Sequence, residues 1–354
     1  MPSRHIARWD LDKTYLRTEF DTVRDLVRTA FERPDEKRTN PGASTLLREM
    51  VRAGISVHIL SGSPEQMRRR LEDKLRLDGI AWDSFTLKPN LQNVLRLRFR
   101  AVKDQLGYKL PALLQARATM IVDPLPDAQG ARSDDARASV PAPAAVRHET
   151  LFGDDAEADA FVYSLYADLV GGRVTEETLL DVLERGRVYP DVVATILRYA
   201  RLIERADAVE RILIHLERQT PPGDFQVYGA RAVPFYNYLQ AAFVVHEDGR
   251  LPPEAVLRVA VELIVQHRFD GNALARSYMD LARRGHLRGT GIDDLSDALQ
   301  GWTHHERVPG GSELRAMMER LPEYAEAARA SYRAEQPACD YVKMVESHNA
   351  RRRH

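Results

Sequence analysis

The stretch HIARWDLDKT, residues 5–14, decides which fold we expect for this chain. Its first five residues read as a short strand, and Asp10 and Asp12 follow where that strand would end. Side chains repeat every two residues along an extended chain, so the two carboxylates point the same way. On its own an Asp-x-Asp-x-Thr motif is weak evidence, because aspartates are also common in turns. Its meaning therefore depends on the segments that accompany it.

Two later polar segments also follow apolar runs. SGSP at residues 61–64 comes after ISVHIL at 55–60, and GDD at 153–155, with Asp159 just beyond it, follows another apolar run. In an open α/β sheet, ligands bind in the crevice outside the carboxyl ends of the strands. The segments would then converge on one pocket. We therefore expect a Rossmann-like α/β domain with a mostly parallel sheet flanked by helices.

Phosphate chemistry accounts for these residue types. Mg²⁺ prefers oxygen ligands and is usually held by one or two carboxylates plus the substrate phosphate, and Asp10 and Asp154 form a natural pair. A carboxylate can also attack phosphorus, and Asp10 is best placed to form an aspartyl-phosphate. Asp12 could protonate the leaving alkoxide and then deprotonate the attacking water. The Ser61 hydroxyl and the Gly62 backbone amide can donate hydrogen bonds to phosphoryl oxygens.

A lysine would add a compact positive charge beside the phosphate. Lys109 is the best candidate, since it opens a predicted helical turn after a glycine and a tyrosine. Lys88, which precedes a proline, and Lys103 are alternatives. The sequence favours Lys109 without deciding among the three.

The ordered set of motifs resembles the haloacid dehalogenase superfamily of phosphatases. The resemblance is carried by DLDKT at residues 10–14, by Ser61 and by GDD at 153–155 with Asp159, and it covers about the first half of the chain. The stretch ILSGSPEQM at 59–67 is similar to a narrower group. That group is the phosphatidate phosphatase catalytic domain first named from an actin-patch protein of yeast.

The resemblance implies a role for each matching residue. Asp10 would be the nucleophile and a Mg²⁺ ligand, and Asp12 would be the general acid and base while giving its backbone carbonyl to the metal. Ser61 would bind the phosphoryl group, and Asp154 would ligate Mg²⁺. Among supporting residues, Thr14 would brace the loop, and Asp155 or Asp159 would hold metal-bound waters.

Composition sets outer bounds on the chain. Its 354 residues are enough for two domains, and 44% hydrophobic with 29% charged residues is typical of a globular protein. A formal net charge of −1 argues against bulk attraction to nucleic acid. The single cysteine, Cys339, fits a reducing compartment. We see neither a signal peptide nor a transmembrane segment, so we expect a cytoplasmic protein.

The pattern predicts two domains. Residues 1–172 would form the haloacid dehalogenase-type domain, with a mobile insertion rich in Pro, Ala and Asp at about 123–148. Beyond the glycine pair at 171–172, residues 173–354 read as an all-helical domain. One of its expected helices covers residues 208–216. The helical domain would cover or extend the site, or bind a protein partner.

The function that we expect is Mg²⁺-dependent hydrolysis of a phosphate monoester. The substrate would be a phosphorylated small molecule or lipid head group, and the narrower resemblance implies phosphatidate. Two alternatives stay open. In the first, the helical half is a protein-interaction scaffold and the phosphatase-like fold is its anchor. In the second, the enzyme acts on a nucleotide or a polynucleotide end, although the near-neutral charge disfavours a nucleic-acid partner.

Overall fold

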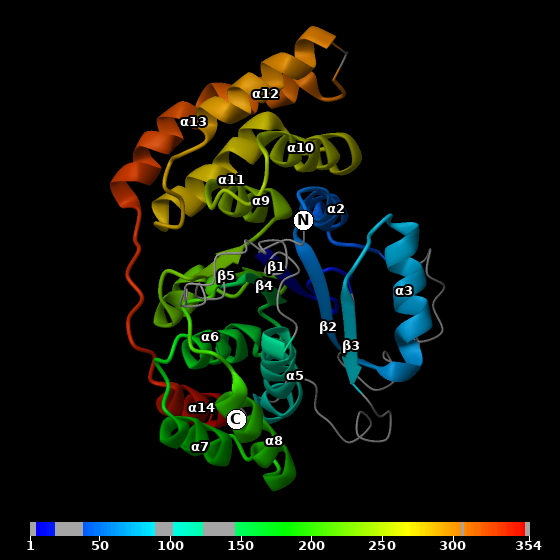
Figure 1. The fold of residues 1–354 in the computed structure, drawn as a ribbon. Coiled ribbons are helices and arrows are strands. Elements are labelled where there is room, and N and C mark those ends of the chain that lie inside the picture. The colour runs from blue at the N-terminus through cyan, green and yellow to red at the C-terminus, as the bar shows by residue number, and fades with distance from the viewer. Residues whose placement is uncertain (1–4, 18–37, 89–101, 123–145, 306–307, 351–354) are drawn as a thin grey trace, which may run out of the picture.

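A computed structural model describes residues 5–17, 38–88, 102–122, 146–305 and 308–350. A six-stranded sheet, in the order β3-β2-β1-β4-β5-β6, runs through the middle of these residues (Figure 1). Every neighbouring pair of strands is parallel. The strands are β1 (His5–Asp10), β2 (Ser56–Pro64), β3 (Ser84–Lys88), β4 (His148–Asp154), β5 (Val209–His215) and β6 (Ala232–Phe235).

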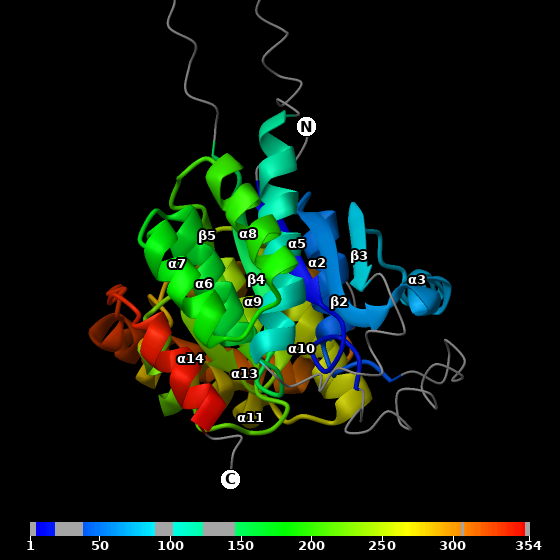
Figure 2. The same ribbon diagram turned by 90° about the horizontal axis from the view of Figure 1, so that it is seen from below.

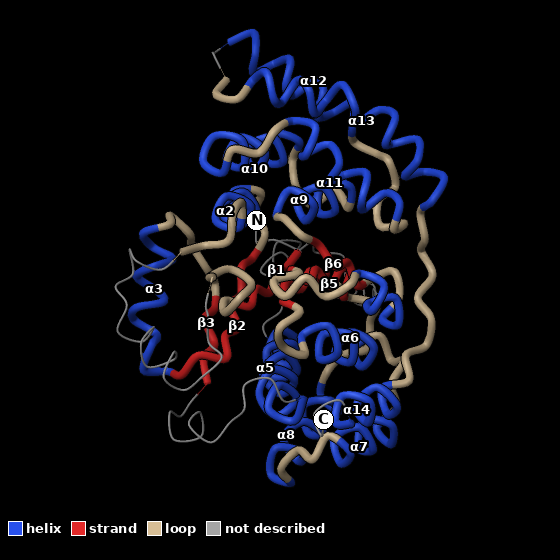
Figure 3. Tube along the Cα trace, turned by 180° about the vertical axis from the view of Figure 1, so that it is seen from behind, coloured by secondary structure: helices blue, strands red, loops and turns tan. Residues whose placement is uncertain are grey.

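Helices cover both faces of this sheet. One face carries α2 (Ala43–Arg52), α3 (Arg68–Leu77), α9 (Tyr238–Glu247), α10 (Pro253–His267), α11 (Gly271–Arg283), α12 (Ile292–His305) and α13 (Gly311–Ser331). The other carries α5 (Val102–Val122), α6 (Asp159–Val170), α7 (Glu176–Arg185), α8 (Pro190–Leu202) and α14 (Tyr341–Ala350). Figure 2 shows the second group in front of the sheet, and Figure 3 shows the strands as the central layer. Two short 3-10 helices, η1 (Glu65–Met67) and η3 (Pro222–Tyr228), complete the elements.

The two faces have separate apolar cores. Consecutive strand residues point to opposite faces. Accordingly, Leu151 and Ile214 lie in the core beneath α5 and α6, whereas their neighbours Phe152 and Leu213 lie in the core beneath α2 and α9. A parallel sheet covered on both faces needs strands that are apolar on both sides. The fold is therefore α/β, as the strand and helix signals of the first half predict.

The expectation of an all-helical second half is wrong. Residues 209–215 form β5, which pairs with β4, and residues 232–235 form β6 at the edge of the same sheet. The run ILI at 212–214 is short, and such a run fits a buried strand as well as a turn of a buried helix. Pro234 argues against a strand interior, but at a sheet edge a proline is tolerated. The expected boundary at residue 172 falls between two adjacent strands of one sheet.

Two further expectations concern the insertion at about 123–148 and the absence of a transmembrane segment. The predicted insertion at about 123–148 lies almost entirely outside the described residues, which resume at residue 146, and it stays a prediction. In the part of the chain that the structure describes, no helix combines the length and the apolar character that a membrane span requires.

Candidate active site

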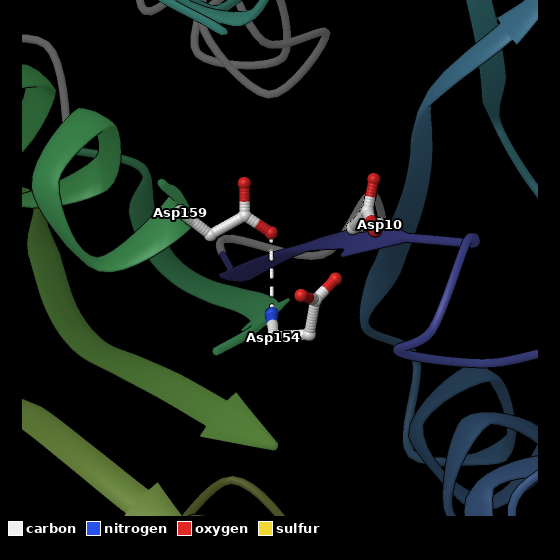
Figure 4. Close-up of side chains that lie close together, drawn as sticks. All are labelled: Asp10, Asp154 and Asp159. Atoms are coloured by element: carbon white, nitrogen blue, oxygen red, sulfur yellow. Dashed lines mark hydrogen bonds between the residues drawn. The ribbon is translucent and has the colours of Figure 1, made fainter. Parts of the chain in front are cut away.

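Three carboxylates meet at the carboxyl ends of β1 and β4. Asp10 is the last residue of β1, Asp154 is the last of β4, and Asp159 is the first of α6. One oxygen from each lies within 4.8 Å of the others, an arrangement that could hold a metal ion. Figure 4 shows the three side chains converging, with the Asp154 backbone amide donating to Asp159 Oδ2 at 3.2 Å. All three are almost fully buried.

Gly153 allows Asp159 to reach this position. A Cβ on Gly153 would lie only 2.5 Å from Asp159 Oδ2 and 2.6 Å from Asp159 Cβ. Asp154 Oδ1 in turn accepts hydrogen bonds from the backbone amides of Ala156 and Glu157, at 2.6 and 2.9 Å. The local sequence GDD thus folds into a tight turn that places Asp154 and the start of α6 side by side.

Lys109 is the cation at this centre. It comes from α5, is fully buried, and lies 3.1 Å from Asp10 Oδ1 and 3.2 Å from Glu157 Oε2, while also bonding Asp159. The four acids, with Asp154 as the fourth, outnumber Lys109 and Lys13, which acts on Asp154, and so leave an excess of negative charge in a buried volume. A buried charge excess is costly unless a counter-ion balances it. The cluster therefore favours an additional cation.

The pKa values follow from this crowding. Burial raises the pKa of Asp10, of Asp154 and of Asp159 above the ordinary aspartate range, and repulsion among the carboxylates adds to it. Lys109 opposes that effect on all three. For Lys109 itself, burial acts to lower the pKa, yet attraction by Asp10, Asp159 and Glu157 raises it well above the usual lysine value. Lys109 is therefore charged at neutral pH.

Asp12 contacts the neighbouring strand β2. Its Oδ2 accepts hydrogen bonds from Ser61 Oγ at 2.8 Å and from Ser63 Oγ at 2.9 Å. Ser61 Oγ also accepts the backbone amide of Ser63 at 3.0 Å. The carboxylate of Asp12 is thus oriented by two hydroxyls, of which the sequence identified only Ser61. Ser63 lies two residues further along the same strand, and this spacing could have revealed it.

Thr14 braces the loop after β1. Its hydroxyl donates towards Asp10 Oδ2 at 3.3 Å and Asp154 Oδ2 at 3.5 Å. The Thr14 carbonyl accepts from Asn40 Nδ2 at 2.7 Å and from the Tyr238 hydroxyl at 2.5 Å. Lys13 within this loop has φ 62°, the left-handed region, and Asn40 also bonds its carbonyl at 3.1 Å. Asn40 and Tyr238 are distant in sequence, so no local pattern could predict them.

Asp155 differs from its expected supporting role beside the metal. Its two carboxylate oxygens accept the backbone amides of Arg218 and Thr220, at 2.8 and 2.9 Å. Asp155 therefore anchors the loop after β5. Asp159 is a member of the three-carboxylate cluster, and Glu157, a residue that the motif did not single out, joins it through Lys109. Gln105 Nε2 donates to Glu157 at 2.6 Å and holds it there.

The other two lysine candidates lie against aromatic rings. Lys103 Nζ is 3.7 Å from the centre of the Tyr189 ring, and Lys88 Nζ is 5.5 Å from that of Tyr108. The Tyr108 hydroxyl donates to the Ser61 carbonyl at 2.7 Å, which places Lys88 near the edge of the site. Of the three, Lys109 is the one in the carboxylate cluster.

On the β2 side of the site, the described residues leave space beside Gly62. A Cβ on Gly62 would meet no atom within 4 Å, and Gly62 itself is half-buried. Two cavities of about 350 Å³ lie elsewhere in the molecule, and none of the site residues lines them. Comparison with family models, with curated proteins and with solved structures finds no match for this chain.

Proposed function

We propose that this protein is a Mg²⁺-dependent phosphomonoester hydrolase that acts through an aspartyl-phosphate on Asp10. The observation that carries the proposal is the meeting of Asp10, Asp154 and Asp159 around Lys109, at the end of the sheet where α/β enzymes bind ligands. Asp12, in the loop after β1, and Ser61 and Gly62, on the neighbouring β2, would supply the groups that phosphoryl transfer needs.

The residues present fit a divalent cation with oxygen ligands. All the donors in the cluster are carboxylate oxygens, the type that Mg²⁺ prefers. Asp10 Oδ1 is buried and accepts no hydrogen bond among the described residues, although Lys109 lies 3.1 Å away. Asp10 and Asp154 would hold the ion, with Asp159 beside them. When bound, Mg²⁺ would neutralise phosphate oxygens and so lower their repulsion of a nucleophile.

The reaction would proceed in two displacements. In the first, an Asp10 oxygen forms a bond to phosphorus while the bond to the leaving alkoxide breaks, and Asp12 delivers its proton to that alkoxide. In the second, Asp12 takes a proton from water as the water oxygen attacks the phosphorus, and the bond to Asp10 breaks. Inorganic phosphate leaves and Asp10 regains its carboxylate. The Ser63 hydroxyl would keep Asp12 aimed throughout, while the Ser61 hydroxyl would turn from Asp12 to the bound phosphoryl group.

The phosphoryl group would sit between Lys109 and β2. Lys109 supplies positive charge from one side, while the Ser61 hydroxyl and the Gly62 amide supply donors from the other. Because Gly62 has open space around it, the rest of the substrate would extend in that direction. Phosphatidate, another phosphorylated lipid or a small phosphate ester would all present their phosphate in this way.

The scaffold alternative assumed an all-helical second half, whereas β5 and β6 of that half complete the sheet. Residues of the second half also hold the catalytic loop, since Tyr238 bonds the Thr14 carbonyl. The class of phosphate ester that the enzyme would hydrolyse has to be identified by experiment.

Phosphate release by the purified full chain tests the proposal. We expect Mg²⁺-dependent release from an aryl phosphate, and a panel of phosphatidate vesicles, nucleotides and sugar phosphates would identify the preferred class. Asp10→Asn should abolish release, because an amide is a poor nucleophile. Asp191→Asn, the same change at an exposed position in the first turn of α8, is the matched control and should keep full activity. Undiminished activity of Asp10→Asn would refute the mechanism.

A further inference from the structure

A cavity of about 350 Å³ lies at the edge of the sheet, away from Asp10. Four separate segments line it: η3, β6, the turn after α11, and the extended stretch at residues 333–337. That stretch belongs to the long connection from α13 to α14, which runs down the side of the molecule in Figure 1. The volume is within the usual range for small-molecule sites, roughly 300–1,000 Å³.

The walls of this cavity are tied to one another. Arg284 Nη1 donates to the Pro234 carbonyl at 2.6 Å, which joins the end of α11 to β6. The Arg333 backbone amide donates to the Gly285 carbonyl at 3.0 Å, and the Ala230 amide donates to the Glu335 carbonyl at 3.1 Å. These bonds hold the extended stretch against the sheet edge. The cavity is therefore formed before any ligand arrives, which reduces the cost of binding.

A glycine permits the closest of these approaches. Gly285 has φ +80°, and a Cβ there would lie 2.7 Å from the Ser331 carbonyl oxygen and 3.0 Å from Arg333 Cγ. Only glycine combines that backbone conformation with that approach. The turn after α11 thus brings Arg333 beside Arg284.

The charged side chains of the lining are mainly basic. The lining holds Arg284, Arg333 and one carboxylate, that of Glu335, and Arg284 is paired with Asp280 outside the lining. Within the described part of the chain, the Arg333 guanidinium makes no ion pair and is exposed. Arginine forks match the oxygen geometry of phosphate and carboxylate groups. Arg333 is therefore available to a ligand.

His286 lines the cavity beside the arginines. The pKa of His286 is lowered to about 3. Burial is the largest cause, and the positive charges of Arg284, Arg211 and Arg333 contribute to the same shift. The imidazole is therefore neutral, and a neutral imidazole can donate one hydrogen bond to an anion. Phe225 and two prolines, Pro222 and Pro337, supply an apolar wall opposite these polar groups.

We propose that this cavity binds a small phosphorylated molecule, its phosphate held by Arg333, Arg284 and His286 and its apolar part packed on Phe225. Arg284 is already paired with Asp280, so the Arg333 guanidinium and the His286 imidazole would supply the main donors, to which Arg284 adds its remaining N–H groups. The proposal is independent of the function of Asp10, because no residue of the cavity belongs to the carboxylate cluster.

Nuclear magnetic resonance of the histidine side chains provides a local test. The full-length protein, labelled with ¹⁵N and kept in a chelator so that no metal is bound, is titrated with phenyl phosphate at neutral pH. The His286 resonances, assigned with His286→Gln, should shift in a saturable manner. Binding of phenyl phosphate at Asp10 would leave them unmoved, so the two sites are distinguished by which resonances respond.

A pair of arginine variants controls for charge. Arg333→Gln should weaken binding roughly tenfold or more, the loss of one hydrogen bond to a charged group. Arg283→Gln, an exposed arginine of α11 that does not line the cavity, removes the same charge and should bind like the parent. Equal weakening by both variants, or an unmoved His286, would overturn the proposal. Binding of benzoate as tight as that of phenyl phosphate would overturn its phosphate preference.

Discussion

Asp159 approaches Gly153 so closely that no other side chain fits at residue 153: a Cβ there would lie 2.5 Å from Asp159 Oδ2. Gly153→Ala should therefore displace Asp159 from Lys109 and from the Asp154 amide. We expect a loss of roughly 1–3 kcal/mol in the free energy of unfolding, typical of overpacking, and weaker Mg²⁺ binding. Denaturant unfolding and calorimetric metal titration measure these two quantities.

The control for that variant is another glycine of the same region. Gly107 lies in α5, and a Cβ there would meet nothing within 4 Å. Gly107→Ala should leave stability unchanged or raise it by up to about 1 kcal/mol, since alanine favours a helix. A Gly153→Ala protein as stable as Gly107→Ala, with unchanged metal affinity, would show that the close approach has no functional weight.

Lys109 and the acids around it make a second prediction. Lys109→Met removes the cation that pairs with Asp10 and Asp159, so these two carboxylates would repel one another more strongly. Breaking a buried pair on one side typically costs about 3–5 kcal/mol. Mg²⁺ should restore part of that loss, which thermal unfolding with and without the metal would measure. Lys103→Met, which removes a lysine stacked on Tyr189, should have a small effect on both quantities.

Asp12 should differ from Asp10 in its kinetic effect. Asp12→Asn should slow turnover by roughly 10²–10⁴-fold, the usual contribution of general acid–base catalysis. The phosphoenzyme on Asp10 should then persist, because the water that hydrolyses it lacks a base. Rapid quench with a ³²P-labelled substrate measures this intermediate. Ser63→Ala removes one of the two hydroxyls on Asp12 and should slow turnover less than Asp12→Asn does. Wild-type rates for Asp12→Asn would exclude it from proton transfer.

The sequence revealed those residues of the site that sit at the ends of strands. Asp10, Ser61 and Asp154 each follow an apolar run, and the period-two spacing placed Asp12 beside Asp10. Asn40 and Tyr238 could not be predicted as site residues, because they are distant in sequence from Thr14, whose carbonyl they contact. A local pattern carries no information about such distant pairs.

The polar character of β1 has a similar explanation. Arg8 is buried, an unusual residue for a central strand, but its Nε lies 2.7 Å from Glu149 Oε2 on the adjacent β4. Arg117 and Tyr166 bond the same carboxylate at 3.0 Å. The buried charges are thus paired and fully bonded, as burial demands. Nothing in the stretch around Arg8 indicates a partner 141 residues away.

A pH prediction follows from His58 on β2. Burial, aided by Arg8, lowers its pKa from 6.5 to about 4. Between those two values the unfolded chain binds a proton that the folded protein does not. Stability should therefore fall as the pH decreases from 6.5 towards 4, with a contribution of at most ~1.4 kcal/mol per pH unit from this group. Urea unfolding at several pH values should show a shallower slope for His58→Gln. An identical slope would mean that other groups dominate.

The last prediction concerns the integrity of the sheet. Two domains meeting at residue 172 would leave a chain ending at Gly172 able to fold, but such a chain lacks β5 and β6. It leaves β4 as an unpaired edge, and it removes the Arg218 and Thr220 amides that bind Asp155. The apolar face beneath α9 would also be exposed, because Trp9 stacks on Phe152 and Tyr238 there. We expect this fragment to aggregate or to lack a cooperative unfolding transition by circular dichroism, whereas the full chain unfolds cooperatively. A soluble fragment with cooperative unfolding and Mg²⁺-dependent phosphatase activity would show that β1 to β4 fold without the rest.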